Sequence, residues 1–246
     1  MYQTFERYST GLSSRLGKAL ILPLLKILLL TFILYLLLTG FFLNSFRIDS
    51  DSMRTALQPG DRVLATKLTY SSRLPFAASR TRPPRRGEIV LMLSPFHTPS
   101  RFPLSAFEPL IRFVTLQRGS VARDLTGRRI PKYLIKRVIA VPGDTLRLEN
   151  YTAYIRPAGE SDFRPEQELI EVDYTVATPG FVAGWQESFP LSGSAEVLTL
   201  GENEYFILGD NRGASSDSRS WGPVEGERIL ARVFLKYWPL RESGRL

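Results

Sequence analysis

The feature that most constrains this chain is a long apolar run near its N-terminus. Residues 27–43 carry no charge, and the apolar character extends back through residues 20–25 with Lys26 as the only charge between the two stretches. A helix needs about 20 mainly apolar residues to cross the hydrocarbon core of a bilayer, and a lysine side chain can extend toward the headgroups. The pattern predicts one transmembrane helix, residues 19–44, preceded by a short N-terminal segment, residues 1–18.

A cleaved signal peptide is the alternative interpretation of this run. Such peptides have apolar cores of about 7–15 residues and end at a small-x-small cleavage site. Here the apolar run is longer and ends in Phe42-Leu43-Asn44-Ser45-Phe46, which favours an uncleaved anchor. Basic residues lie on both sides of the run, so the positive-inside rule does not fix its orientation.

The remainder, residues 45–246, has the pattern of a mainly β domain. Short runs of β-forming residues are separated by turn sequences such as Pro142-Gly143-Asp144. Two stretches, residues 95–131 and 157–200, are irregular and rich in Pro, Ser and Gly or Arg, and they are expected to be insertions on the β scaffold. The expected strands are 63–65, 88–93, 134–141, 145–148, 153–155, 205–208 and 229–238.

Composition excludes several kinds of chemistry. The chain has no cysteine and one histidine, His97, so disulfides, thiolate nucleophiles and zinc sites built on several Cys or His ligands are ruled out. We expect neither a metal nor an organic cofactor. The formal net charge is +8, but the basic residues are dispersed and no nucleic-acid-binding motif accompanies them, so an anionic membrane surface is the favoured partner and nucleic acid is not.

Two residues carry the candidate chemistry, Ser52 and Lys136. A serine hydroxyl attacks a carbonyl only when a neighbouring base removes its proton, and this chain offers few bases. Lys136 follows Ile135 and precedes Val138 by two positions, in a run expected to be a strand. If burial desolvates the lysine, its pKa can fall by up to about 3–5 units, which makes the amine a competent general base.

Three motifs occur in a fixed order behind the apolar run. They are Ser50-Asp51-Ser52-Met53, the stretch 133–144 with Ile135-Lys136-Arg137-Val138 at its centre, and the stretch 209–222. The last contains Gly209-Asp210-Asn211-Arg212, Ser215, Asp217-Ser218-Arg219 and Trp221-Gly222. In this order they resemble the motifs of type I signal peptidases, membrane-anchored Ser/Lys serine proteases that remove signal peptides from exported preproteins. The resemblance implies a β-barrel-like signal-peptidase domain outside the cytoplasm.

The resemblance also implies a role for each motif residue. Ser52 would be the nucleophile and Lys136 the general base. The Ser50 hydroxyl and the Ser52 backbone N–H would form the oxyanion hole. Ser215 would orient the lysine amine, and Asp217 and Arg219 would be a supporting ion pair.

The expected substrate is an extended peptide that adds to exposed strand edges. The shallow pockets of the protein that receive the side chains of this peptide would be lined by Ile48, Met53, Leu134 and Ile135. The family implies a preference for Ala-x-Ala before the cut. The partners would be exported preproteins and the bilayer, with a secretion translocon nearby. The protein would then be a single-pass protein of the cytoplasmic (inner) membrane, with residues 1–18 in the cytoplasm and 45–246 outside it.

Two further functions stay open at this stage. One is a specialised Ser/Lys peptidase for a single secreted or pilin-type precursor. The other is a degenerate, non-catalytic membrane-tethered module that binds signal peptides. The second is motivated by two departures from the usual family residues. This chain has Thr55 and Ala56 where the family usually has Pro and Thr, and it has Gly213 and Ala214 where the family usually has Asp and Asn.

Overall fold

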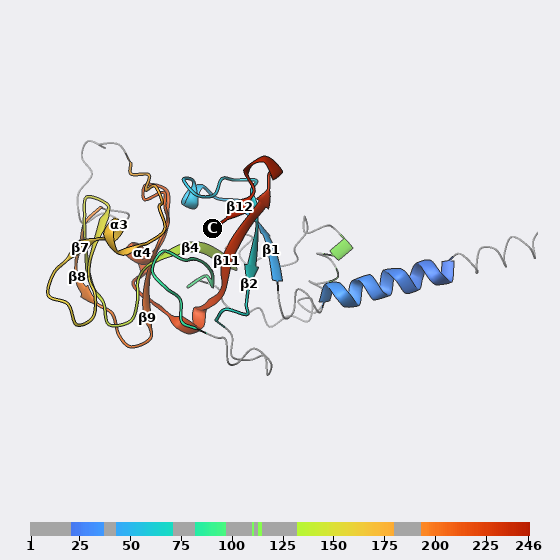
Figure 1. The fold of residues 1–246 in the computed structure, drawn as a ribbon, viewed down its shortest axis with the longest axis horizontal. Coiled ribbons are helices and arrows are strands. Elements are labelled where there is room, and N and C mark those ends of the chain that lie inside the picture. Colours follow the sequence, from blue (N-terminus) through green and yellow to red (C-terminus); the bar gives the residue numbers. More distant parts are fainter. Residues whose placement is uncertain are drawn as a thin grey trace, which may run out of the picture. The chain divides into compact units, whose positions relative to one another are not determined.

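The apolar run forms a helix over residues 21–36 (Figure 1). The structure is a computed structural model that describes residues 21–36, 43–70, 82–96, 110, 113–114, 132–179 and 193–246. The chain divides into two compact units, Met1–Gly40 with Ser100–Arg123 and Phe41–Pro99 with Asp124–Leu246. Parts of the predicted insertions, the single His97 and the segment 1–18 lie outside the described residues.

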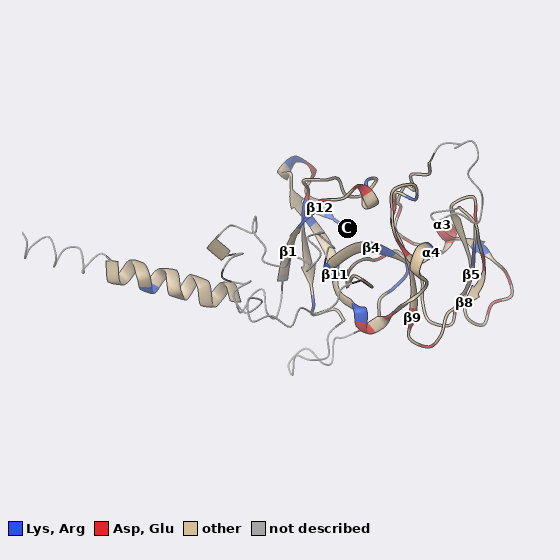
Figure 2. Ribbon diagram, turned by 180° about the vertical axis from the view of Figure 1, so that it is seen from behind, with Lys and Arg blue, Asp and Glu red and all other residues tan. Residues whose placement is uncertain are grey.

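In the first unit, the helix presents its apolar side chains to the outside, and Leu30 for example is 68% exposed. The ring of Phe113 packs on this helix, with its centroid 5.1 Å from that of Phe32 and 5.2 Å from that of Tyr35. Lys26 is its only charged residue (Figure 2). Within the described residues, no helix is both long and apolar enough to span a membrane.

The predicted boundary of the anchor at residue 44 is wrong. Residues 19–20 and 37–42 lie outside the description, but Leu43 and Asn44 belong to a strand, β1 (Leu43–Arg47). In β1 they pair antiparallel with Thr66 and Ala65, so these two residues cannot continue a helix. The apolar run therefore ends in the first strand of the β domain.

The second unit is built on an eight-stranded, mainly antiparallel sheet with the order β1-β2-β11-β3-β4-β9-β10, where β12 pairs with β11. The predicted runs 63–65, 88–93, 134–141, 205–208 and 229–238 each form a strand of this sheet, whereas β1, β10 and β12 were not predicted. The strands other than β1 are β2 (Arg62–Thr66), β3 (Ile89–Leu93), β4 (Tyr133–Ala140), β9 (Glu204–Leu208), β10 (Val224–Glu225), β11 (Ile229–Trp238) and β12 (Gly244–Arg245).

A second, four-stranded sheet has the order β7-β6-β5-β8. The strands β5 (Thr145–Glu149) and β6 (Thr152–Arg156) were predicted, but β7 (Arg164–Pro165), the short helix α3 (Glu166–Leu169) and β8 (Ala195–Thr199) arise from the stretch that the sequence marked as an irregular insertion. Figure 1 shows α3, β7 and β8 together, and the described part of residues 157–200 is thus partly built into the scaffold.

The domain is mainly β, as predicted. In the described part of the chain the pairing path runs from β1 at one edge to β10 at the other, so barrel-like closure remains a prediction. Three clusters of buried apolar residues fill the domain, one of which includes Met53 and Val63, another Val90 and Val138, and the third Leu146 and Ile155 beneath the smaller sheet. Short helical turns complete it: η2 (Asp51–Met53), α4 (Ser218–Trp221), η5 (Gly226–Arg228) and η6 (Leu240–Glu242).

Candidate active site

Ser52 lies in a short 3-10 turn, η2, which follows the edge strand β1. The turn is anchored by Ile48, whose N–H donates to the Asp61 carbonyl at 2.8 Å and whose own carbonyl accepts from Gly60 N–H at 2.8 Å. The side chain of Ser52 is buried, while Ser50 before it is exposed. The two hydroxyl oxygens lie 3.2 Å apart, so Ser52 Oγ and Ser50 Oγ share a hydrogen bond.

Lys136 lies in β4, an inner strand of the larger sheet that pairs with β3 and β9. It is 3% exposed, and its register partner on β3 is the buried Val90. Burial lowers the pKa of Lys136 to about 8; the charge of Asp217 opposes the lowering and that of Arg219 adds to it. Removal of water disfavours the ammonium form, so a substantial fraction of this amine is neutral near pH 8.

The last motif is held by the ion pair of Asp217 and Arg219. Arg219 donates from Nε to Asp217 Oδ1 at 2.8 Å and from Nη2 to Asp217 Oδ2 at 3.0 Å. Both side chains are buried, and Asp217 also accepts from Gly209 N–H at 3.1 Å. Asp217 is the N-cap of α4 as well, so one carboxylate fixes the helix start, the arginine and Gly209.

Gly209 is where the motifs meet. A Cβ built on this glycine would fall 2.5 Å from the backbone oxygen of Ser52, 2.5 Å from Ser215 Cβ and even closer to Ser215 Oγ. Asn211 adds a second link, because its backbone N–H donates to the Ser52 carbonyl at 3.0 Å and its side-chain amide to the Asp51 carbonyl at 3.1 Å. The structure therefore brings Ser52 and Ser215 together around a residue that has no room for a side chain.

The contacts expected for Lys136 are not hydrogen bonds in this structure. Among the described residues, no hydrogen bond joins the Lys136 amine to Ser52 or Ser215, and Ser215 Oγ is buried without a hydrogen-bond partner. The link between Lys136 and the last motif is electrostatic, because the charges of Asp217, Arg219 and Asp210 each affect the pKa of Lys136. An unpartnered buried hydroxyl is costly, and it marks a position at which a donor or acceptor is still to be supplied.

Of the four residues expected to line the substrate pockets, three lie together. Ile48 and Met53 are buried in one apolar cluster, and Ile135 packs against it. Leu134 packs against a different cluster, the one that contains Val138. The reason is strand alternation, which places Leu134 and Ile135 on opposite faces of β4.

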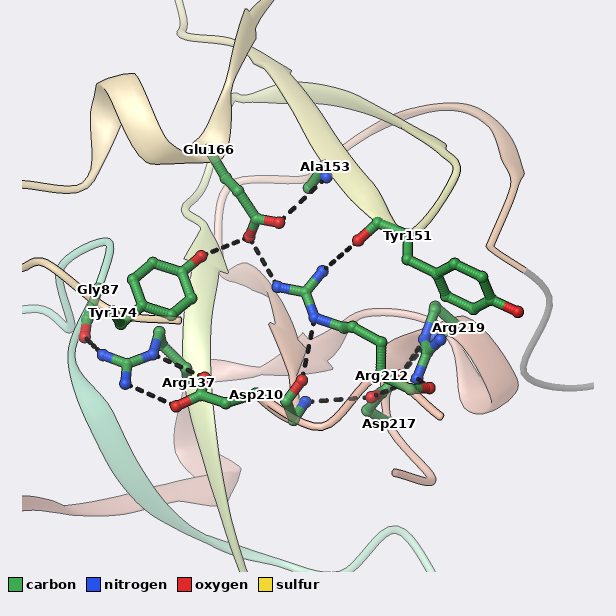
Figure 3. A network of polar contacts seen from close by, with 11 residues as sticks. Gly87, Arg137, Tyr151, Ala153, Glu166, Tyr174, Asp210, Arg212, Asp217 and Arg219 are labelled. Carbon is green, nitrogen blue, oxygen red and sulfur yellow. Dashed lines mark hydrogen bonds and ion pairs between the residues drawn. The ribbon is translucent and has the colours of Figure 1, made fainter. Parts of the chain in front are cut away.

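A network of buried charges beside the site was missed at the level of the sequence (Figure 3). Arg137 donates to both carboxylate oxygens of Asp210 at 2.8 and 2.7 Å, and Arg212 donates to Glu166 at 2.8 Å. Arg137, Asp210 and Arg212 stood inside the motifs without an assigned role. Glu166 lies in the irregular stretch, where no local pattern distinguishes it from the exposed acidic residues around it.

The described residues hold no group of three or more His, Cys, Asp or Glu side chains that could bind a metal ion. The arrangement offers instead a shielded amine of lowered pKa, a buried serine hydroxyl and a second hydroxyl at hydrogen-bond distance from it. These are the groups that general-base catalysis of acyl transfer requires.

Comparison with known proteins supports this chemistry. The profile of the family described as signal peptidase, peptidase S26, matches residues 21–238. A protein named "Probable signal peptidase I-2" from Synechocystis is 27% identical over 199 residues, which are 81% of this chain and 65% of that protein. A second Synechocystis protein, "Probable signal peptidase I-1", is 26% identical over 90% of this chain and 85% of its own length.

The signal peptidase I of Pseudomonas aeruginosa is 29% identical over 83% of this chain and 68% of its own length. A crystal structure of a signal peptidase I from Enterococcus faecalis superposes with a TM-score of 0.30 at 22% identity, over 61% of this chain and 97% of that one, and so low a score supports no argument about the fold.

Proposed function

The chain belongs to the signal peptidase family, peptidase S26, and on this premise we propose that it is a serine endopeptidase that removes signal peptides from exported preproteins. The observation that carries the proposal is the burial of Lys136, which lowers its pKa to about 8 in a domain whose described part offers no imidazole and no metal cluster. A base of this kind is what Ser52 needs in order to become a nucleophile.

In the proposed reaction, the neutral Lys136 amine accepts the proton of Ser52 Oγ as this oxygen attacks the scissile carbonyl. The tetrahedral oxyanion is stabilised by the Ser50 hydroxyl and the Ser52 backbone N–H. The lysine then gives its proton to the leaving amine, and an acyl-enzyme ester remains on Ser52. That leaving amine is the N-terminus of the mature protein, which is released at this step, so the ester carries the signal peptide alone. A water molecule, deprotonated by the same lysine, hydrolyses the ester and releases the signal peptide, and the proton returns from the lysine to Ser52 Oγ.

The Ser50–Ser52 hydrogen bond belongs to the free enzyme in this proposal. A bound peptide excludes water from the site, and catalytic hydrogen bonds often tighten only in the complex with substrate. Ser52 Oγ would then turn toward Lys136, and Ser215 Oγ, which has no partner among the described residues, would accept a hydrogen bond from the amine and orient its lone pair.

We assign the substrate as an extended segment that ends in Ala-x-Ala, bound beside the edge strand β1. Ile48, Met53 and Ile135 form the apolar floor against which small side chains fit, and Leu134 lies on the other face of β4. The helix over 21–36 would be part of a membrane anchor that holds the domain at the outer surface of the cytoplasmic membrane, near a translocon and close to where a signal peptide leaves the lipid.

The test is cleavage of a labelled Ala-x-Ala precursor by the full chain in detergent. Ser52→Ala and Lys136→Ala should each abolish cleavage, and Lys136→Arg should do so too because a guanidinium stays protonated. Ser94→Ala and Lys236→Ala are matched controls, a buried serine and a lysine of β11, and should cleave like the unchanged protein. Activity in Ser52→Ala or Lys136→Arg would refute the assignment, and cleavage of a single dedicated precursor would favour a specialised peptidase.

A further inference from the structure

The stretch 166–179 lies outside the three motifs, yet one of its residues is among the most buried charges of the domain. Glu166 is 0% exposed and has three hydrogen-bond donors: the N–H of Ala153 at 3.2 Å, the Tyr174 hydroxyl at 2.6 Å and Arg212 Nη2 at 2.8 Å. Burial raises the pKa of Tyr174, so its hydroxyl stays protonated and donates. A carboxylate buried this deeply is stable only because its partners are so complete.

The main partner, Arg212, connects Glu166 to the candidate site. Arg212 is also 0% exposed, and it donates from Nε to the Gly209 carbonyl at 3.0 Å and from Nη1 to the Tyr151 carbonyl at 2.9 Å (Figure 3). Gly209 in turn lies against Ser215 and the backbone of Ser52. The contact chain from Glu166 to the Ser215 hydroxyl and the Ser52 backbone therefore has two intermediates, Arg212 and Gly209.

The other end of the stretch contacts the same motif through its backbone. The N–H of Ala177 donates to the Asp210 carbonyl at 2.9 Å, and the Ala177 carbonyl accepts from Arg212 N–H at 2.7 Å, which makes a parallel bridge beside Asn211. Asn211 uses its own N–H to bind the Ser52 carbonyl at 3.0 Å. The motif is thus held on one side by Ala177 and on the other by the turn that carries Ser52.

We infer that residues 166–179 form a clamp that positions the motif 209–215 against the Ser52 turn, with Glu166 as its positioning residue. The inference rests on the proposed peptidase function. The clamp has two attachments, the Glu166–Arg212 ion pair and the Ala177 bridge. Both hold Arg212 or Asp210, which are next to or bonded to Gly209 and Asn211, the residues that touch Ser52 or Ser215. Because a displacement of about 1 Å at a reacting group can cost about a hundredfold in rate, loss of the clamp acts on catalysis and not only on folding.

The first arm of the test measures kinetics of the full chain on an Ala-x-Ala precursor. Glu166→Gln should lower kcat about tenfold or more with KM within about twofold, because the charge-assisted bond to Arg212 is lost while the peptide-binding strands are intact. Tyr174→Phe should have a smaller effect of the same kind. Glu160→Gln is the matched control, since Glu160 pairs with Arg164 at the exposed surface of the same insertion, and its kcat should not change.

A purely structural role predicts a different outcome for the apolar pair Glu166→Leu with Arg212→Met. Replacing both members of a buried ion pair by apolar residues often restores stability. If the clamp positions the motif, this double variant should unfold at a temperature near that of the unchanged protein but keep the loss in kcat. Recovery of kcat together with stability would overturn the inference.

The second arm does not depend on activity. Amide hydrogen exchange of the peptide that covers residues 209–215 reports the N–H groups of Gly209, Asn211 and Arg212, which donate to Asp217, Ser52 and Ala177. In Glu166→Gln this peptide should exchange at least about tenfold faster, while peptides of β2 and β11 keep their rates. Unchanged exchange at 209–215 would overturn the clamp, whereas absence of cleavage by the unchanged protein would overturn only the proposed peptidase.

Discussion

The two sides of the candidate site are held in different ways. Lys136 lies in an inner strand, and its surroundings include the buried ion pair Asp217–Arg219. Ser52 lies in a three-residue turn after an edge strand, with the exposed Ser50 and Asp51 beside it. The difference shows which part of the chemistry needs a fixed environment: a lysine pKa depends on desolvation and on nearby charges, whereas a hydroxyl must be free to turn from Ser50 to the base.

Gly209 lies at the junction between the two sides of the site, and a side chain introduced there should have the largest effect of the variants considered. Gly209→Ala places a methyl group 2.5 Å from the Ser52 backbone oxygen and against Ser215, so the turn and the motif must separate. We expect kcat on a precursor to fall by about a hundredfold or more. Gly244→Ala is the control, because a Cβ there meets nothing within 4 Å. A Gly209→Ala enzyme that keeps a third of its activity would show that the junction tolerates separation.

The sequence predicted the strand that carries Lys136 better than it predicted the buried ion pairs around the site. The run around Lys136 predicted a strand, because neighbouring residues are enough to define its two faces, but burial of the lysine was only a condition of its role as a base. Arg137 and Asp210 are also within the motifs, but their mutual ion pair joins residues far apart in sequence and follows from the pairing of β4 with β9, which no local pattern encodes. Glu166 and Tyr174 could not be found at all, because only the fold brings them to Arg212.

One sequence prediction failed for a local reason. The apolar run was expected to continue as a helix to residue 44, but its last residues pair with β2, and apolar β-forming residues fit a strand as well as a membrane helix. Two of the arginines before β3 are paired within the domain, Arg82 with Glu88 and Arg86 with Asp144.

The base side can be examined through stability, where the expected effect is next in size. The folded pKa of Lys136, about 8, is below the ordinary value of 10.5, so between these pH values the unfolded chain binds more protons and the lysine costs less stability as pH rises. Lys136→Met should therefore increase the free energy of unfolding by roughly 3 kcal/mol at pH 7 and by about half of that at pH 9.5.

Urea unfolding of the full chain at the two pH values measures this gain. Lys132→Met is the matched control, because Lys132 precedes the same strand but is exposed, and this substitution should not give the gain in stability at pH 7. A Lys136→Met protein that is less stable at pH 7 than the unchanged chain would mean that the ammonium of Lys136 is well solvated or paired. The statement that desolvation sets the environment of this lysine would then be wrong.

The ion pair beside Lys136 allows a sharper test through the pH dependence of activity. Only the neutral amine is a base, so the ascending limb of kcat/KM should have its midpoint near pH 8. Asp217 raises the lysine pKa and Arg219 lowers it. Asp217→Asn should therefore move the limb to lower pH and Arg219→Met to higher pH, each by about one unit. A disturbance of packing alone would not give shifts of opposite sign, and equal shifts in one direction would contradict the electrostatic account.

The smallest expected effect concerns Gly213, one of the departures from the usual family residues. A Cβ at this position would lie 3.0 Å from Pro179 Cβ and 3.3 Å from its Cδ, so glycine is what allows the end of the clamp to pack on the motif. Gly213→Ala should destabilise the protein by less than about 1 kcal/mol, because Pro179 needs to move by only a few tenths of an ångström.

The double variant decides whether this contact is the cause. Pro179→Gly removes the two side-chain atoms that the new methyl group meets and leaves only the backbone nitrogen at 3.3 Å, so Gly213→Ala should cost less in that background, with a coupling of about 0.5 kcal/mol in urea unfolding. If Gly213→Ala lowered the free energy of unfolding equally in the unchanged and the Pro179→Gly proteins, the contact with Pro179 would not be the reason for glycine at position 213. A coupling of the expected sign would instead mean that glycine at position 213 is what allows Pro179, the last residue of the clamp, to pack this closely on the motif.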